Sequence, residues 1–508
     1  MAAAVVLLGF CWRLWLAHAT FFNTDEAWHF SVANQDSLIA AYSASLTLAH
    51  PPLLVFILYF WRHLGTSDVV LRLPVVLAGS IFCWVFFKWL SLLFGRTVAW
   101  VGLILAAFLP PMIALSAELR QYSFMLLFAV AATCFVERAL RDNSSGMMLL
   151  SSLSLYLAML SHYSAFLFAA SLGIYVIVRM VSNRPSNGVI AAWAAGQVVG
   201  VGLAGILFAT HIAKLGSVYP VAQPLQRFGD FYLFDWYFHP GREHFATFLY
   251  RGTFGIFRFI FGQTAVGQVA ALLFVAGVIL LLSNGISKRS AALLLISPFV
   301  LNWIAVAAGL YPYGRTRHCI FLAIFALSGV ALALVRVARN RSVVAVGLAL
   351  MVVVLCQAFG TLQGRDMLPL SEQRHEHMDQ AIQLLRAQVL PGDVILTDHA
   401  TSFQLRHYLC NDRPESIQPI ADGGEWYQCD GFRVLCAGSP YEALTPESVA
   451  AQQTGLREFN RVWVVQGGWG KGLGEALRSQ FPAFSAIEIH SFGLYLEIFQ
   501  TPPPPQIT

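Results

Sequence analysis

The sequence predicts an all-α bundle of about eleven transmembrane helices, followed by a small C-terminal α/β domain. Hydrophobic residues make up 57% of the 508 residues and charged residues only 12%, far from the composition of a soluble protein. Apolar runs of about twenty residues, long enough to cross the hydrocarbon core of a bilayer, recur from residue 3 to residue 361. After residue 361 these runs stop, and patterns typical of short strands and helices alternate.

The membrane domain is therefore expected to cover residues 1–361. Its spans are expected at residues 3–19, 72–94, 97–115, 121–139, 147–160, 163–181, 189–210, 263–283, 291–309, 318–335 and 343–361. The first stretch is interpreted as a retained helix, because it lacks a basic N-terminal region and contains Arg13.

Loop charges predict the orientation of these helices. If the N-terminus is cytoplasmic, the basic residues of the inside loops are Lys88, Arg96, Arg138, Arg141, Arg179, Arg184, Lys288, Arg289, Arg336, Arg339 and Arg341. The short outside loops then hold only Arg120, Arg315 and Arg317. This asymmetry predicts a multi-pass inner-membrane protein in which residues 20–71, 211–262 and 362–508 are extracytoplasmic.

The segment from Pro52 to Leu64 is also apolar, and a crossing there would invert every later helix. It is short for a span, begins with two prolines and ends in Trp61, Arg62 and His63. We expect an interfacial or re-entrant helix, because a crossing would reverse the charge asymmetry.

Residues 362–508 are predicted to form a soluble α/β domain with a disordered, proline-rich tail. Strands are expected at Val394–Thr397, Arg461–Gln466 and Gly493–Phe499, and helices at Ser371–Gln388, Thr401–Leu409 and Lys471–Gln480. The domain contains Cys410, Cys429 and Cys436, and an extracytoplasmic location permits one disulfide among them with one thiol left over.

Ionisable residues at the ends of membrane helices are costly to keep there and are functional candidates by default. On the predicted topology they collect at the outer boundary. The candidates are Asp25, Glu26, His50, Arg72, Glu118, Arg120, Tyr122, His162, Tyr163, Arg315 and Arg317. The formal charge of +5 is spread over many short loops, so no nucleic-acid partner is expected.

The order of these motifs resembles the GT-C superfamily of membrane glycosyltransferases. The likeness is greatest to the bacterial branch related to protein O-mannosyltransferases and the lipid A aminoarabinose transferase. The matching motifs are Asp25-Glu26, HPPL at 50–53, LGTSDVVLRLP at 64–74, Ser116 with Arg120-Gln121-Tyr122, His162-Tyr163, and Arg315 with Arg317. The resemblance covers roughly residues 1–335 and implies a GT-C-like catalytic domain.

The resemblance implies inverting transfer of a sugar from a polyprenyl-phosphate donor to a hydroxyl of a lipid, glycan or protein acceptor. A carboxylate must then accept the proton of the hydroxyl, and Asp25, with Glu26 beside it, is the candidate. The leaving lipid phosphate requires cationic donors, for which Arg120, Arg315 and Arg317 are the first candidates. Arg13, Arg72 and Tyr122 are secondary candidates for the phosphate. His50, Glu118, His162 and Tyr163 are assigned to substrate binding.

Each motif also has a purely structural interpretation. Asp25-Glu26 suits the start of a helix, Glu118 and Arg120 can form a surface ion pair, and a lone His162 is often structural. No cofactor is expected to be required. Asp25, His29 and His50 are of residue types that bind divalent ions, but their spacing matches no recognised metal motif.

Two alternatives belong to other functional classes. A secondary transporter would place charges along a pathway and normally shows repeated, broken helices near the membrane centre, whereas these charges gather at one face. A structural scaffold would not explain why the charged residues gather at one face of the membrane. The sequence therefore favours a glycosyltransferase that uses a lipid-phosphate sugar.

Overall fold

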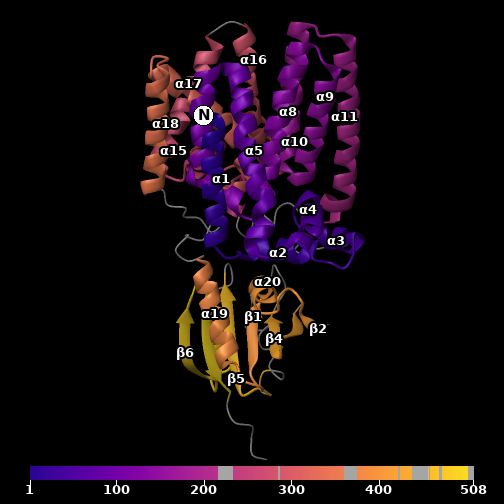
Figure 1. The fold of residues 1–508 in the computed structure, drawn as a ribbon, viewed down its shortest axis with the longest axis vertical. Coiled ribbons are helices and arrows are strands. Elements are labelled where there is room, and N and C mark those ends of the chain that lie inside the picture. The colour runs from indigo at the N-terminus through magenta and orange to yellow at the C-terminus, as the bar shows by residue number, and fades with distance from the viewer. Residues whose placement is uncertain are drawn as a thin grey trace, which may run out of the picture. The chain divides into compact units, whose positions relative to one another are not determined.

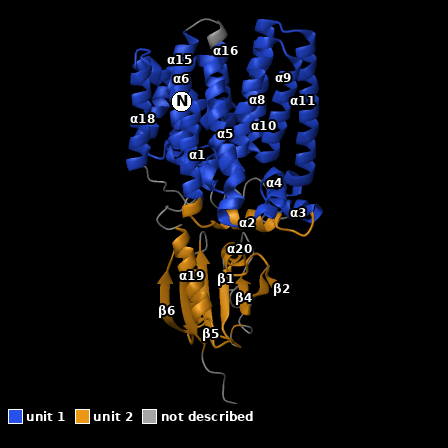
Figure 2. Cartoon of the chain, viewed as in Figure 1, with its two compact units in different colours: residues 1–17, 38–366 blue, residues 18–37, 367–508 orange. Residues whose placement is uncertain are grey.

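A computed structural model gives the fold and describes residues 1–214, 233–283, 286–359, 374–420, 424–437, 456, 458–467, 472–492 and 494–501. Contacts divide the chain into two compact units, coloured separately in Figure 2. The larger unit holds residues 1–17 and 38–366, and the smaller holds residues 18–37 and 367–508. Part of the expected first outer loop, residues 18–37, thus groups with the C-terminal residues.

The larger unit is built from helices, and the longer ones run side by side (Figure 1). They are α1 (Ala2–Ala19), α3 (Leu38–Ser45), α4 (Leu53–Trp61), η1 (Arg62–Leu64), α5 (Asp68–Phe94), α6 (Arg96–Phe108), α7 (Pro110–Ala117), α8 (Tyr122–Asp142), α9 (Ser145–Ser161), α10 (Ser164–Asn183), α11 (Asn187–Leu207), η2 (Phe208–Ile212), η4 (Phe234–Trp236), α14 (Phe245–Phe261), α15 (Thr264–Leu282), α16 (Ile286–Ala307), η5 (Arg317–Leu322), α17 (Ala323–Val337) and α18 (Ser342–Phe359).

The helices confirm the predicted membrane bundle. Within the described ranges, nine helices are long and apolar enough to cross a membrane, and the bent pair of α6 and α7 makes a tenth. The remaining predicted span corresponds to α9, an apolar helix of 17 residues. The segment 53–64 forms a shorter apolar helix, in agreement with its interpretation as too short for a span.

The break between α6 and α7 explains a buried arginine. Pro110 begins α7, and the two helices differ in direction by 57°. Because a proline offers no backbone N–H and disfavours helical backbone in the preceding residue, the last carbonyls of α6 lose their helical partners. Arg13 of α1 donates hydrogen bonds of 3.0 Å to the carbonyls of Ala106 and Ala107. Arg13, a secondary phosphate candidate, therefore stabilises a helix end.

The approach of α15 to α17 depends on glycine. A Cβ added to Gly277 would lie 2.2 Å from the carbonyl oxygen of Gly329, so these helices pack backbone against backbone. This contact fixes α17, the helix that continues η5.

The smaller unit contains α2 (Thr24–Ala33), α19 (His375–Gln388), β1 (Val394–Asp398), α20 (His399–Tyr408), β2 (Glu415–Pro419), β3 (Glu425–Cys429), β4 (Phe432–Ala437), β5 (Arg461–Gly467), α23 (Leu473–Gln480), β6 (Ser485–Ser491) and β7 (Leu494–Gln500). The described strands form a seven-stranded sheet in the order β2-β3-β4-β1-β5-β7-β6. In its centre β1 pairs in parallel with β4 and β5, and the outer pairings are antiparallel.

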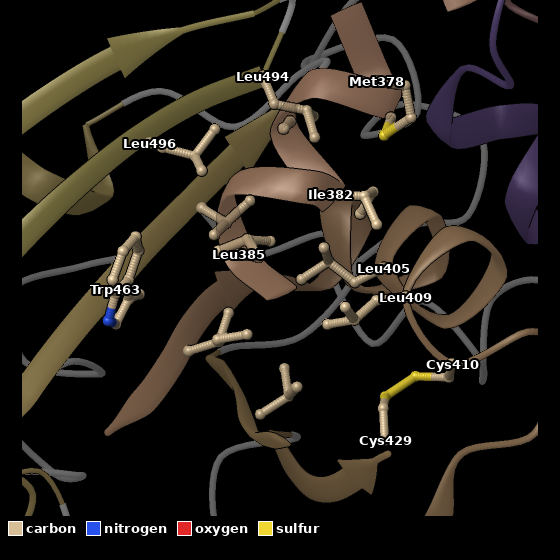
Figure 3. Packing of buried hydrophobic residues seen from close by; sticks show 14 of the residues in the cluster. Met378, Ile382, Leu385, Leu405, Leu409, Cys410, Cys429, Trp463, Leu494 and Leu496 are labelled. Carbon is tan, nitrogen blue, oxygen red and sulfur yellow. A yellow bond between two sulfur atoms is a disulfide. The ribbon is translucent and has the colours of Figure 1, made fainter. Parts of the chain in front are cut away.

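Both faces of the sheet bury apolar side chains, which confirms the predicted α/β domain. On one face α19 and α20 contribute Met378, Ile382, Leu385, Leu405 and Leu409 to a core with the strands, as Figure 3 shows. On the other face the core includes α23. The alternation of side chains along each strand thus divides the domain into three layers.

The predicted elements of the domain coincide with α19, β1, α20, β5, α23 and β7, with shifts of a few residues at the ends. The strands β2, β3, β4 and β6 were not predicted. The proline-rich tail lies outside the described residues, apart from Thr501.

One disulfide closes part of this core. Cys410 follows α20 and pairs with Cys429 at the end of β3, with their Cα atoms 4.7 Å apart, while Cys436 is a free, buried thiol. The pairing selects one of the three arrangements that the sequence left open.

We expect Cys410→Ser to lower the free energy of unfolding of the smaller unit by about 3 kcal/mol, because the disulfide closes a loop with a sequence separation of 19. Thermal unfolding of the purified protein measures the change. Cys11→Ser, at an exposed free cysteine, is the matched control. Equal melting temperatures for Cys410→Ser and wild type would contradict the prediction.

Candidate functional site

Polar side chains of the larger unit meet where helices break. His50 precedes α4, Arg120 lies between α7 and α8, His162 lies between α9 and α10, and Arg317 begins η5. They come together although they are far apart in the sequence. We call this group the histidine–arginine cluster, and its members are His50, Arg120, Tyr122, His162, Arg317 and His318.

Three imidazoles form the centre of the cluster. The ring centroids of His50 and His162 are 5.6 Å apart, those of His162 and His318 are 5.6 Å apart, and those of His50 and His318 are 6.2 Å apart. The ring of Tyr122 lies 5.2 Å from that of His162. The cluster thus places several hydrogen-bonding nitrogens around one small region.

Two buried arginines accompany the imidazoles. Arg120 is 2% exposed and Arg317 is 5% exposed, and each guanidinium carbon lies 5.8 Å from the ring centroid of Tyr122. The Nη2 atom of Arg120 donates to Nε2 of His50 at 3.2 Å. Because arginine only donates, the neutral His50 ring carries its proton on Nδ1. Both guanidinium groups lie beside the Tyr122 ring, and because arginine presents a planar fork of charged donors, the cluster is suited to binding an anion such as a phosphate.

The chain before η5 is held by local contacts that orient His318. The hydroxyl of Tyr311 donates to the carbonyl of His318 at 3.1 Å, and the Thr316 side chain accepts from the His318 backbone at 3.4 Å. The buried Tyr313 shares a 2.7 Å hydrogen bond with Thr253 of α14. These contacts fix the entry to η5 and hence the positions of Arg317 and His318.

His162 is a neutral member of this cationic group. Burial, followed by the charges of Arg120 and Arg317, lowers the pKa of His162 from 6.5 to about 3. The backbone N–H of Ser164 donates to Nδ1 of His162 at 3.2 Å, so the neutral ring carries its proton on Nε2. His162 can therefore donate a hydrogen bond from Nε2 at neutral pH.

The depressed pKa of His162 predicts acid sensitivity. The unfolded chain binds a proton near pH 6.5, whereas the folded protein resists protonation until about pH 3. The stability due to neutral His162 is therefore complete above pH 6.5 and is lost as the pH falls toward 3, by about 1.4 kcal/mol per pH unit. We expect His162→Gln to flatten the fall in melting temperature between pH 6.5 and pH 4.

The control is His375→Gln, at a position of α19 where the side chain is 37% exposed, and this variant is expected to keep the acid slope of the wild type. An unchanged slope in His162→Gln would contradict the assigned protonation state.

The structure places four other predicted residues around helix ends. Arg72 is buried and donates to the carbonyl of Ala17 at 2.7 Å, close to the end of α1. Glu118 is the C-cap of α7, and its carbonyl accepts from the Arg120 backbone at 2.7 Å. Tyr163 stacks on Phe166, with centroids 6.3 Å apart. Arg315 packs its backbone against α14, where a Cβ on Gly255 would lie 3.1 Å from its nitrogen.

The smaller unit contains the acidic pair, and its structure separates the two carboxylates. Glu26 closes a capping box, because its carboxylate accepts from the Asn23 backbone at 2.9 Å and its N–H donates to the Asn23 side chain at 3.0 Å. Asp25 precedes it in the first turn of α2, where helix dipoles attract negative charge, and is 7% exposed. The structural interpretation thus holds for Glu26, and Asp25 becomes the candidate for chemistry.

Helix α2 is anchored on α20. The Phe22 N–H donates to the Tyr408 hydroxyl at 2.6 Å, and the Phe22 carbonyl accepts from Gln404 at 2.8 Å. Trp28 stacks on Phe403 with an interplanar angle of 9°. The C-terminal residues therefore supply the packing surface for the helix that bears Asp25.

Sequence reasoning did not select some of these residues. His318 directly follows Arg317 in a polar stretch, and this position was the signal that could have identified it. Gln404 and Tyr408 gave no such signal, because they appear as ordinary residues of an amphipathic helix in the distant C-terminal domain.

Comparison with known proteins adds a family relationship to this geometry. The family model for dolichyl-phosphate-mannose-protein mannosyltransferase matches residues 49–211. This stretch contains His50, Arg120, Tyr122 and His162 of the cluster. No curated protein sequence matches the chain.

Solved structures share the fold over nearly the whole chain. The crystal structure of ArnT from Cupriavidus metallidurans bound to undecaprenyl phosphate has 14% sequence identity and a TM-score of 0.58, covering 98% of this chain and 97% of that chain. The structure of ArnT from the same organism in the apo state has 13% identity and a TM-score of 0.56, covering 98% of this chain and 97% of that chain.

A third structure is more distant. The Archaeoglobus fulgidus oligosaccharyltransferase tethered to an acceptor peptide has 10% identity and a TM-score of 0.50, covering 91% of this chain and 68% of that chain. The chain therefore has the GT-C fold. Its fold is similar to that of ArnT, and its residues 49–211 are similar to the protein mannosyltransferases.

Proposed function

We propose that this chain is a glycosyltransferase that takes a sugar from a polyprenyl-phosphate donor and transfers it to an acceptor hydroxyl with inversion. The observation that carries the proposal is the histidine–arginine cluster, in which Arg120 and Arg317 are buried around Tyr122 beside three imidazoles. A lipid phosphate is the anion that such donors at helix ends suit. The similarity to ArnT bound to undecaprenyl phosphate supports the same donor class.

In the proposed reaction the acceptor oxygen attacks the anomeric carbon as the bond from that carbon to the phosphate oxygen breaks. The electron pair leaves with the polyprenyl phosphate. Arg120, Arg317 and the Nε2–H of His162 stabilise the charge that develops on the phosphate. Asp25 accepts the proton of the acceptor hydroxyl, and Glu26 keeps its structural role in the cap of α2.

The proposal places the reaction on the extracytoplasmic face of the inner membrane. It rests on the excess of basic residues in the alternate loops, which assigns the N-terminus to the cytoplasm and residues 367–508 to the opposite side. The disulfide between Cys410 and Cys429 supports an oxidising compartment for that unit. The acceptor belongs to the lipids, glycans or proteins of that compartment, and no metal takes part in the proposed transfer.

Membranes containing the protein should release radiolabelled sugar from undecaprenyl-phosphate sugars and form a labelled product. A panel of donors with different hexoses and pentoses identifies the sugar, and the matching nucleotide sugars serve as controls. We expect transfer from at least one lipid-phosphate donor and none from nucleotide sugars.

The orientation is tested with the same preparation. In sealed right-side-out spheroplasts, a protease added outside should cleave residues 367–508 without lysis. Transfer from nucleotide sugars alone would reject the donor class, and cleavage only after lysis would reject the proposed face.

A further inference from the structure

A second group of reactive side chains lies in the smaller unit, where the register of the sheet brings three of them together. Cys436 of β4 stands opposite Thr397 of β1 on one side and opposite Glu425 of β3 on the other. Side chains of directly paired residues emerge on the same face of a sheet. His399 follows the last residue of β1 and begins α20, which packs on that face. The strands β3 and β4 and the start of α20 therefore position Glu425, Cys436 and His399, respectively.

The potential ligand atoms are close to one another. Nδ1 of His399 lies 4.0 Å from Sγ of Cys436, and the ligand atoms of His399, Glu425 and Cys436 all lie within 4.8 Å of one another. Cys436 is buried, and the other two are half-buried, so a bound ion would keep one open side. Among the described residues, His399, Glu425 and Cys436 are the one group of three histidine, cysteine or acidic side chains whose ligand atoms lie this close together.

We infer that His399, Glu425 and Cys436 form a zinc site in the α/β domain, with water as a fourth ligand. An imidazole nitrogen, a carboxylate oxygen and a thiolate sulfur are the three ligand types that zinc binds in proteins. Magnesium and calcium prefer oxygen-only sites, which excludes them here. Tetrahedral zinc would set the nitrogen and the sulfur about 3.6 Å apart, so a small closure of the observed 4.0 Å suffices.

The surroundings of the three residues support a held geometry. Arg406 donates to Oε1 of Glu425, which orients the carboxylate and leaves its other oxygen available to a metal. The Arg406 guanidinium also lies 4.8 Å from the ring centroid of Tyr427. The His399 ring packs edge-on against Phe403, with centroids 4.9 Å apart. A hydrogen-bonded carboxylate and an aromatic shell are typical of protein metal sites.

Zinc at this position would join the first residue of α20 to the β3–β4 hairpin. The same helix carries Phe403, on which Trp28 of α2 stacks. The metal would therefore brace the helix that anchors the acidic segment. This inference is independent of the proposed function, because it concerns binding and stability.

Metal content of the full-length protein tests the inference. The protein is purified in detergent without reductant, stripped with a chelator, equilibrated with zinc, dialysed and measured by mass spectrometry. We expect one zinc per chain in the wild type and in Cys356→Ser, a buried cysteine of α18 outside the group. We expect at least a tenfold loss of zinc affinity in Cys436→Ser and His399→Gln. Zinc should also raise the melting temperature of the wild type.

Cobalt substitution adds a readout that identifies the thiolate. The wild type loaded with Co²⁺ should show a thiolate-to-metal charge-transfer band in the near ultraviolet, and Cys436→Ser should lack it. If Cys436→Ser fails to fold, Glu425→Gln, at a partly exposed position, provides the affinity test. A wild type that retains no zinc after dialysis overturns the inference, as does equal zinc affinity in the folded variants.

Discussion

Asp25→Asn should lower the rate of sugar transfer by about 10²–10⁴-fold while leaving the folded protein intact, because an amide cannot take the acceptor proton. Asn keeps the size of the side chain and its place in the first turn of α2. Initial rates with a saturating lipid-phosphate donor, at matched expression and in the same membranes, measure the effect.

The neighbouring carboxylate supplies the matched control. Glu26→Gln should retain the rate of the wild type, because glutamine can also accept the Asn23 N–H that Glu26 accepts at 2.9 Å. Glu26→Ala should lower the free energy of unfolding by about 1 kcal/mol, the usual loss when a helix cap is removed. If Asp25→Asn transfers sugar at the wild-type rate, Asp25 is not the base. If Glu26→Gln alone is inactive, the two roles must be exchanged.

Arg120→Gln should lower kcat/KM by about 10²–10³-fold, the usual effect of removing one donor from a developing negative charge. Arg120 is buried, contacts Tyr122 and donates to His50, so its guanidinium is held before any ligand arrives. Steady-state transfer rates measure the loss in kcat/KM, and direct binding of radiolabelled undecaprenyl phosphate measures how much of that loss is lost affinity for the lipid phosphate.

Two further variants separate charge from geometry. Arg120→Lys should recover only part of the activity, because lysine keeps the charge but lacks the planar fork that binds two phosphate oxygens. Arg141→Gln, at an exposed position near the end of α8, should behave as the wild type. Normal binding of the lipid phosphate by a folded Arg120→Gln protein would reject the role of Arg120 in the donor site.

The membrane bundle could be predicted from the sequence because each span is a local signal of hydropathy and length. The strands β2 and β6 could not, because their side chains are almost all exposed, so neither strand has a buried face that would mark it in the sequence. In β3 and β4 the buried and exposed faces can be assigned only once the register of the two strands is known. The sequence alone also did not show whether Cys429 or Cys436 pairs with Cys410.

The candidate residues were also found from local patterns, since a charged side chain at the end of an apolar helix is conspicuous by itself. Their partners were not. Nothing local indicates that Arg13 serves the carbonyls of Ala106 and Ala107. Such roles depend on the backbone geometry of breaks and caps, which a list of residue types does not contain.

The packing of α2 on α20 has a consequence for biosynthesis. Residues 18–37 leave the ribosome among the first, whereas the helix on which they pack, His399–Tyr408, is made only after the whole membrane bundle. During that interval the acidic segment lacks the surface of α20 on which it packs in the finished protein, so the proposed base is not yet held in its final structure. A nascent or prematurely terminated chain would thus be inserted in the membrane yet catalytically silent, and activity would begin only when translation is complete.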